Sequence, residues 1–408
     1  MNGVNINLFQ FDYDLTWMAF FMDADDRFYA RYGGREDEHA ESHLSKESLA
    51  RTMRAVLELH REGKVQSSRY EPTGRPPRTP EEIPTMRAMI ARRKVSCIHC
   101  HDVKVATLRD LQDRGQFDRS MIFAYPTPRS IGIEVDREVQ DILRKVVPGA
   151  PAARAGLRPG DEIESADGAR VLTVGDLARV LEKTPKEAVL PLVVRRGGER
   201  VGADLRLSGN WKRSADPSWR ESMHVAGPNA GFWGRALNDR QKREAGIPVG
   251  RMALEVTFLF PNHPTPRKAG LEIGDRVVEV DGRREPMTIR QLHALCQMER
   301  QYGDRLPVVI LRDGRETRLT LELPTEPSRN DRAAPEQALR RADLIESEPE
   351  DTKGTQEIRP WAWSSGHTTS RPWATPTGST ARSWWNPSSP SSPSTGSSAT
   401  RSSPCPHT

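Results

Sequence analysis

The string AARAGLRPGDEIESADG at residues 152–168 recurs in altered form as RKAGLEIGDRVVEVDG at residues 267–282. Aligning Ala155 with Ala269 gives an offset of 114 residues, which indicates an internal repeat. In each copy, Ala-Gly-Leu begins a tight turn, Gly-Asp leads into a strand, and Asp-Gly closes a hairpin. These residues build a fold, so by themselves they indicate structure rather than chemistry.

Each copy then continues in the same order. A predicted helix is followed by a strand, a basic glycine turn and a closing strand. In the first copy these elements are 174–181, 190–194, 195–198 and 201–207, and in the second they are 289–298, 307–311, 312–314 and 318–323. We therefore predict two similar modules, at residues 129–208 and 222–325, joined by a linker at 209–221.

The repeated strings resemble the PDZ family in its bacterial, protease-associated form. The resemblance implies β-sandwich modules that bind an extended peptide, usually a free C-terminus, by strand addition, while backbone N–H groups of a loop hold its carboxylate. That loop has an apolar-Gly-apolar signature, which Ile131-Gly132-Ile133 matches in the first module. In the second module the nearest run is Gly231-Phe232-Trp233-Gly234, about 20 residues before the next strand at 253–259.

The resemblance therefore implies that these two runs bind peptide. The expected binding residues are Ile131, Gly132, Ile133, Phe232, Trp233 and Gly234. For the apolar members the alternative is ordinary core packing, because large apolar side chains favour burial.

Residues 1–62 predict a strand at 15–22, an acidic turn at 23–26, a strand at 27–32 and then a helix. Ser45 is its expected N-cap, and its apolar stripe comprises Leu49, Met53, Val56, Leu57 and His60. The run FFMDADDRFYARYGG resembles the C-terminal half of a thioredoxin-like fold. The Cys-x-x-Cys of that family would precede Met1, so we expect the chain to lack the first half of such a fold, with its redox motif and an export signal. The alternative is a small α/β cap that packs on the rest.

A linker at 63–83 leads to a predicted helical segment at 84–128, which contains Cys97-Ile98-His99-Cys100-His101. The Cys-x-x-Cys-His spacing is typical of covalent haem c attachment, with Cys97 and Cys100 on the haem vinyl groups and His101 as proximal iron ligand. Met121 is the expected sixth ligand, with Met86, Met89 and His60 as alternatives.

Other interpretations of this motif stay open. Cys97, Cys100 and His101, with or without His99, could bind zinc, although no second ligand pair lies nearby in the sequence. The two thiols could instead form a redox dithiol or be structural. Cys296 lies on an apolar helical stripe and is expected in a core, whereas Cys405 shows no partner spacing.

Composition excludes several classes of function. The 408 residues include 61 basic and 56 acidic ones, and a net charge of +5 over this length gives no argument for nucleic-acid binding. No apolar run reaches the roughly 18 residues of a membrane span. Neither Gly-x-Ser-x-Gly nor His-Glu-x-x-His occurs, so no complete catalytic set is evident and we expect a protein without enzymatic activity. Residues 326–408 are predicted to be disordered, and the acid-free part from Arg359 resembles an out-of-frame translation.

These observations predict an α+β multidomain chain: a partial thioredoxin-like fragment, two PDZ-like β-sandwich domains and a disordered tail. The combination resembles an exported bacterial thioredoxin/PDZ protein family, which implies the cell envelope or periplasm although no signal peptide begins the chain. We expect a scaffold that binds peptide C-termini or extended protein segments, with an envelope protease as a further partner. The alternative is a c-type cytochrome-like electron-transfer or thiol-redox protein whose PDZ domains only dock partners.

Overall fold

The computed structural model describes residues 1–326, apart from residues 38, 67–69, 71–74, 94–96 and 214–215. The predicted disordered tail therefore lies outside the described residues, except for Glu326. The described residues form a mixed α+β fold. None of their helices is both long and apolar enough to cross a membrane.

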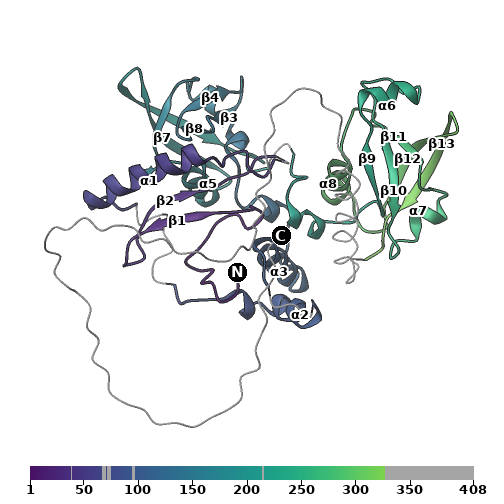
Figure 1. The fold of residues 1–408 in the computed structure, drawn as a ribbon, viewed down its shortest axis with the longest axis horizontal. Coiled ribbons are helices and arrows are strands. Elements are labelled where there is room, and N and C mark those ends of the chain that lie inside the picture. The colour runs from purple at the N-terminus through teal and green to yellow at the C-terminus, as the bar shows by residue number, and fades with distance from the viewer. Residues whose placement is uncertain (38, 67–69, 71–74, 94–96, 214–215, 327–408) are drawn as a thin grey trace, which may run out of the picture. The chain divides into compact units, whose positions relative to one another are not determined.

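The first repeat forms a small module of antiparallel strands and two helices (Figure 1). Strand β3 pairs with β4, and a second sheet has the order β6-β5-β7-β8. The helix α5 lies on one large apolar core that both sheets share. The bounds are β3 (Ile133–Val135), β4 (Leu143–Val146), α4 (Pro151–Arg154), β5 (Glu162–Ala166), β6 (Ala169–Arg170), α5 (Val174–Lys183), β7 (Ala188–Arg196) and β8 (Glu199–Leu207).

The second repeat forms one five-stranded sheet in the order β13-β12-β11-β10-β9, with helices α6, α7 and α8. The long insertion after the first strand contains α6, yet β9 still pairs directly with β10. Cys296 is buried in this core, as expected, and burial raises the pKa of its thiol to about 12. The bounds are β9 (Phe232–Ala236), α6 (Asp239–Glu244), β10 (Leu254–Leu259), α7 (Thr265–Lys268), β11 (Arg276–Val280), α8 (Ile289–Glu299), β12 (Arg305–Arg312) and β13 (Arg315–Glu322).

The helices and hairpins predicted from the repeat are confirmed. Helices α5 and α8 begin at the predicted residues, and the pairs β7–β8 and β12–β13 are the predicted hairpins. Asp281 and Gly282, in the second Asp-Gly turn, have φ angles of 52° and 78°. This left-handed backbone is what a tight turn between antiparallel strands requires.

The aspartate of the repeated Gly-Asp pair anchors an arginine clamp that is the same in both modules. Arg196 donates to both carboxylate oxygens of Asp161 at 2.7 and 2.8 Å and to Gly156 O at 2.8 Å. In the second module Arg312 binds Asp275 in the same bidentate way, at 2.6 and 2.7 Å, and donates to Gly270 O at 2.7 Å. Burial raises the pKa of Asp161, but the hydrogen bonds from Arg196 and Arg158 outweigh it and lower this pKa below its usual value. The Gly-Asp motif is thus a structural clamp.

The N-terminal hairpin and helix are present, as β1 (Ala19–Met22), β2 (Phe28–Tyr32) and α1 (Lys46–Arg61). They pack on the first module: Arg31 N–H donates to Asp176 Oδ1 at 2.8 Å, and the Thr173 hydroxyl donates to Arg31 O. Both partners belong to the start of α5, and β2 lies beside α5 (Figure 1). This arrangement agrees with a cap that packs on the rest of the chain.

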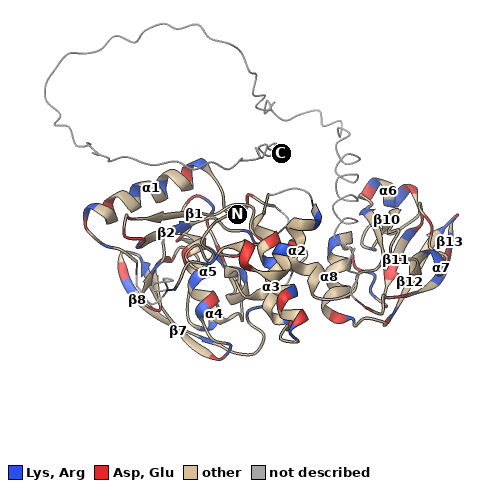
Figure 2. Ribbon diagram, turned by 90° about the horizontal axis from the view of Figure 1, so that it is seen from below, with Lys and Arg blue, Asp and Glu red and all other residues tan. Residues whose placement is uncertain are grey.

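The predicted apolar stripe of α1 is wrong in orientation. Met53 and Leu57 are 49% and 53% exposed, whereas Ser48 and Thr52 face inward. The helix has this orientation because a hydrogen bond holds its polar face toward β2. The Ser48 hydroxyl lies 2.6 Å from the Tyr32 hydroxyl. Both α1 and α6 carry basic and acidic residues, in keeping with the balanced composition (Figure 2).

A buried cluster of four charges joins distant parts of the sequence. Asp12 and Asp14 come from the N-terminal segment, Lys104 from α3 (Cys100–Asp113), and Arg220 from the linker between the modules. Lys104 Nζ lies 3.2 Å from Asp12 Oδ1 and 3.5 Å from Asp14 Oδ2. Arg220 contacts both carboxylates, and Ser222 donates its N–H and hydroxyl to Asp14 at 2.9 and 2.7 Å. Two acids and two bases thus balance in a region that excludes water.

We predict that Asp14→Leu lowers the free energy of unfolding by about 3–5 kcal/mol, because it leaves Arg220 and Lys104 buried with too little negative charge. Urea denaturation of the whole chain measures this. The matched control is Asp25→Leu, at a carboxylate that is 76% exposed in its ion pair with Arg27 and should matter little.

The same cluster sets a pH dependence. Burial raises the pKa of Asp14, but Lys104 and Arg220 outweigh it and hold this pKa below its usual value. The stabilisation of the folded state by the Asp14 carboxylate is therefore fully present above the unfolded pKa of about 3.9. It is lost as the pH falls through the lower pKa of the folded state. Equal stability of Asp14→Leu and the parent protein at pH 7 would contradict this account.

Candidate functional site

A glycine with left-handed backbone marks the loop before β3. Gly132 has φ 84° and follows the short 3-10 helix η4 (Pro128–Ile131). A Cβ atom at this position would lie 2.0 Å from the Cβ of Ala150, at the start of α4. Only glycine fits here, which agrees with the loop predicted at Ile131-Gly132-Ile133.

The corresponding loop of the second module lies one residue earlier than predicted. Gly231 has φ 77°, precedes β9, and would place a Cβ 2.8 Å from Pro266 at the start of α7. Gly132 likewise precedes β3 and lies close to the start of α4. The run of the second module that matches Ile131-Gly132-Ile133 is therefore Ala230-Gly231-Phe232. Gly234 has another role, because a Cβ there would lie 2.5 Å from Glu255 O on the neighbouring strand β10.

The apolar side chains of both loops belong to the cores. Ile131, Ile133 and Phe232 are fully buried, and Trp233 is half-buried. Core packing is therefore their structural role, and the groups available to a ligand are those of the backbone. Strand β3 pairs with β4 along one edge and β9 with β10 along one edge; neither has a second partner strand among the described residues.

Helices α5 and α8 occupy equivalent places in the two repeats. Both begin after a threonine N-cap, Thr173 or Thr288, so the two helices align at an offset of 115 residues. Ala178 of α5 therefore corresponds to His293 of α8. This pair distinguishes the two modules, because one position is small and the other carries an aromatic, titratable ring.

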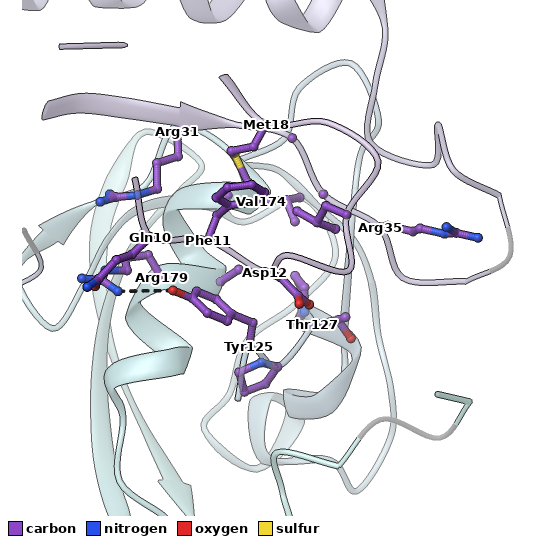
Figure 3. Close-up of a pocket in the computed structure, with 17 residues that line it drawn as sticks. Gln10, Phe11, Asp12, Met18, Arg31, Arg35, Tyr125, Thr127, Val174 and Arg179 are labelled. Atoms are coloured by element: carbon purple, nitrogen blue, oxygen red, sulfur yellow. Dashed lines mark hydrogen bonds between the residues drawn. The ribbon is translucent and has the colours of Figure 1, made fainter. Parts of the chain in front are cut away.

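The N-terminal segment covers the face of α5 that carries Val174 and Ala178. A small cavity there is lined by Gly33 and Gly34 from the segment after β2, by Thr127 before η4, and by Val174 and Ala178 of α5 (Figure 3). Its free space is about 30 Å³, which suits one or two water molecules but no peptide side chain. Gly34 is required in this position, because a Cβ would lie 2.9 Å from Val174 Cγ1.

An internal carboxylate binds at the loop of the first module. Glu36 Oε1 accepts a hydrogen bond from the Arg129 backbone N–H at 3.2 Å, at the start of η4. Its Oε2 lies 3.4 Å from Arg129 Nε and 3.1 Å from His43 Nε2. The Glu36 side chain is only 3% exposed. A carboxylate of the chain itself thus binds the backbone two residues before the run Ile131-Gly132-Ile133.

The Cys-x-x-Cys-His motif lies at the N-terminus of α3. His99 is the N-cap, Cys100 is the first helical residue, and both Cys97 and Cys100 are half-buried. Cys100 is a free thiol whose pKa is raised by burial, although the N-terminal amine of Met1 opposes this. The His101 side chain is 38% exposed, and its ring stacks on that of His99 at 5.6 Å.

The expected sixth ligand packs elsewhere along α3. Met121 lies against a cluster that contains Val105 and Leu108, one and two turns after His101, whereas Cys100 packs against Phe11, Leu15 and Trp219. Met86 and Met89 are buried in a further cluster, and His60 Nδ1 lies 2.9 Å from the Tyr29 hydroxyl. Within the described ranges no three His, Cys, Asp or Glu side chains converge as metal ligands. Haem c and zinc at this motif stay predictions.

Three features of the site were not found in the sequence: Glu36, His43 and His293. Glu36 meets Arg129 across 93 residues of sequence, with no spacing that signals the contact, and His43 contacts Glu36. His293 could have been found by aligning the two helices on their threonine caps.

Comparison with known proteins agrees with the first module. Residues 142–196 match the PDZ domain family. The chain is 25% identical over 231 residues to a probable periplasmic serine endoprotease DegP-like protein of Hahella chejuensis, covering 54% of this chain and 47% of that protein. It is 30% identical over 139 residues to the magnetosome formation protease MamE of Paramagnetospirillum magneticum, covering 31% and 18%. The chain thus spans less than half the length of either relative.

Two solved structures give lower similarity. The HtrA-type protease AlgW with a decapeptide matches at TM-score 0.24 and 13% identity, covering 50% of this chain and 64% of that one. An aminopeptidase N family protein from Idiomarina loihiensis matches at TM-score 0.19 and 19% identity, covering 25% and 14%. From the sequence matches, the chain contains a PDZ domain at residues 142–196 and is distantly similar to HtrA/DegP-type serine proteases.

Proposed function

We propose that this chain binds extended protein segments or C-termini through its PDZ fold and serves as a non-enzymatic scaffold of the bacterial cell envelope. The observation that carries the proposal is the edge of β3 that has no partner strand in the described part of the chain, next to a sequence that matches the PDZ domain family. The envelope location is supported by the similarity to a probable periplasmic protein.

The backbone of β3 has the orientation that strand addition needs. Val147 N–H donates to Gly132 O at 2.8 Å, and Asp136 N–H donates to Ile142 O at 2.9 Å, so the even-numbered residues face β4. Because peptide groups alternate along a strand, the N–H and C=O groups of Ile133 and Val135 point to the other edge. An added peptide strand would receive main-chain hydrogen bonds from these two residues, and nearby side chains would select its sequence.

Ala178 is suited to admit a ligand side chain, because its own side chain is small and lines the cavity at α5. The cavity is too small for a ligand as it stands, so binding would move the segment 33–37. The Glu36 carboxylate then acts as an internal competitor for a ligand that ends in a free carboxylate. Release of Glu36 leaves Arg129 and His43 available to the incoming group.

A scaffold role agrees with the absence of the Gly-x-Ser-x-Gly and His-Glu-x-x-His motifs from the sequence. Both curated relatives are proteases by name, but the chain spans only part of each. We therefore propose that any proteolysis comes from a partner, an envelope protease whose substrates or termini this chain would hold.

We predict that Ala178→Arg weakens binding of C-terminal peptides by at least tenfold, because the longer side chain fills the cavity at α5 that would admit a ligand side chain. Fluorescence anisotropy of peptides selected from a randomised C-terminal pool measures the change. Val189→Arg is the matched control, since Val189 is 53% exposed on β7. Equal binding by Ala178→Arg and the control, or no enrichment of any peptide by the parent chain, would refute the proposed site.

We predict the opposite effect for Glu36→Gln. The neutral amide pairs less well with Arg129 and His43, so the internal competitor is weakened and peptide affinity rises roughly five- to tenfold, within the range expected for one ordinary hydrogen bond. Glu62→Gln, at a half-exposed carboxylate paired with Lys64, is the control. An unchanged affinity, or a gain that amidated peptides share equally, would show that Glu36 does not compete with a ligand carboxylate.

A further inference from the structure

The second module has a side chain in the place where a ligand would add to its sheet. Phe260 N–H donates to Gly231 O, and Leu237 N–H donates to Ala253 O, so the odd-numbered residues of β9 face β10. The carbonyl of Phe232 therefore lies on the free edge of β9. His293 Nε2, on α8, lies 3.0 Å from this oxygen.

This hydrogen bond defines the state of the imidazole. A carbonyl only accepts, so Nε2 carries the proton and donates it to Phe232 O. The bond uses an edge group of β9 that an added strand would need. His293 and such a strand therefore exclude each other.

Aromatic packing holds the ring in place. The imidazole stacks on Trp233 with centroids 5.6 Å apart and on Phe260 at 6.2 Å. His293 is 6% exposed. It thus links α8 to β9, whereas the equivalent Ala178 of the first module lines a cavity between α5 and the N-terminal segment.

We propose that His293 is an internal ligand that occupies the free edge of β9 at neutral pH, which is the closed form of the second module. Protonation of its imidazole frees this edge and gives the open form. The proposal goes beyond the peptide binding suggested for the first module, because it concerns a conformational equilibrium that exists without ligand.

The electrostatic surroundings support this direction. Burial lowers the pKa of His293 to about 4, although the hydrogen bond to Phe232 O opposes the shift. The charges of Arg290 on the same helix and of His263 before α7 also lower the pKa of His293. Glu221 lies 3.5 Å from Arg290 and offsets part of its charge. Charge on the ring is thus unfavourable while the module is closed.

The direction in which pH changes the ratio of open to closed forms follows from proton linkage. In the open form the ring is hydrated and its pKa returns toward about 6.5, so the open form binds more protons below that pH. Acid therefore favours opening. For pKa values of about 4 and about 6.5, the ratio of open to closed forms rises roughly eightfold from pH 7 to pH 5.5.

Hydrogen–deuterium exchange of the whole chain tests this without any ligand. Corrected for the intrinsic pH effect, exchange of the segment 230–238 is expected to rise several-fold from pH 7 to pH 5.5 in the parent protein. In His293→Ala it should be fast at both pH values. His293→Gln is the decisive variant, because its amide can still donate to Phe232 O but does not titrate. In this variant the segment 230–238 should stay protected from exchange at both pH values.

Exchange that is independent of pH in the parent protein, or equal in His293→Ala and the parent, would overturn the proposal. A rise with acid that His293→Gln shares fully would also overturn it, because another group would then be responsible. Peptide binding is a separate readout. In an Ala178→Arg background, His293→Ala should gain affinity at pH 7; if no peptide binds any variant, the scaffold function fails while the exchange result still decides the role of His293.

Discussion

The described part of this chain depends on four buried charges. Asp12 and Asp14 hold the N-terminal segment against Lys104 of α3 and Arg220 of the linker between the modules. Because buried charges are stable only when they are balanced and hydrogen-bonded, this cluster is favourable as a complete set. It anchors residues 10–18, which with the segment after β2 cover α5 (Figure 3).

The two modules share a frame and differ at the site. Both use a bidentate arginine on the aspartate of the repeated Gly-Asp pair, and both need a left-handed glycine before the edge strand. At the equivalent helix position, however, one has Ala178 and the other His293. In the first module a distant segment covers α5, and in the second the imidazole of His293 is hydrogen-bonded to Phe232 O. We propose that these are two different controls over strand addition in one duplicated fold.

The sequence predicted what depends on local residues. The repeat strings gave the turns, helices and hairpins, because Asp-Gly and Ala-Gly-Leu act within a few positions. The stripe on α1 was wrong because Tyr32 draws Ser48 inward, which no helical periodicity shows. Glu36 and Arg129 are 93 residues apart and Asp12 and Arg220 are 208 apart, so only the fold brings them together. The haem c prediction at Cys97, Cys100 and His101 stays a prediction.

Strand addition would place an extended ligand along the edge of β3 that faces away from β4. Amide chemical shifts of the whole chain, recorded during titration with an enriched C-terminal peptide, test this most directly. The account predicts that the N–H signals of Ile133 and Val135 shift first, together with that of Arg129 as Glu36 is displaced. Saturable shifts confined to other strands, with these three signals unmoved, would contradict it.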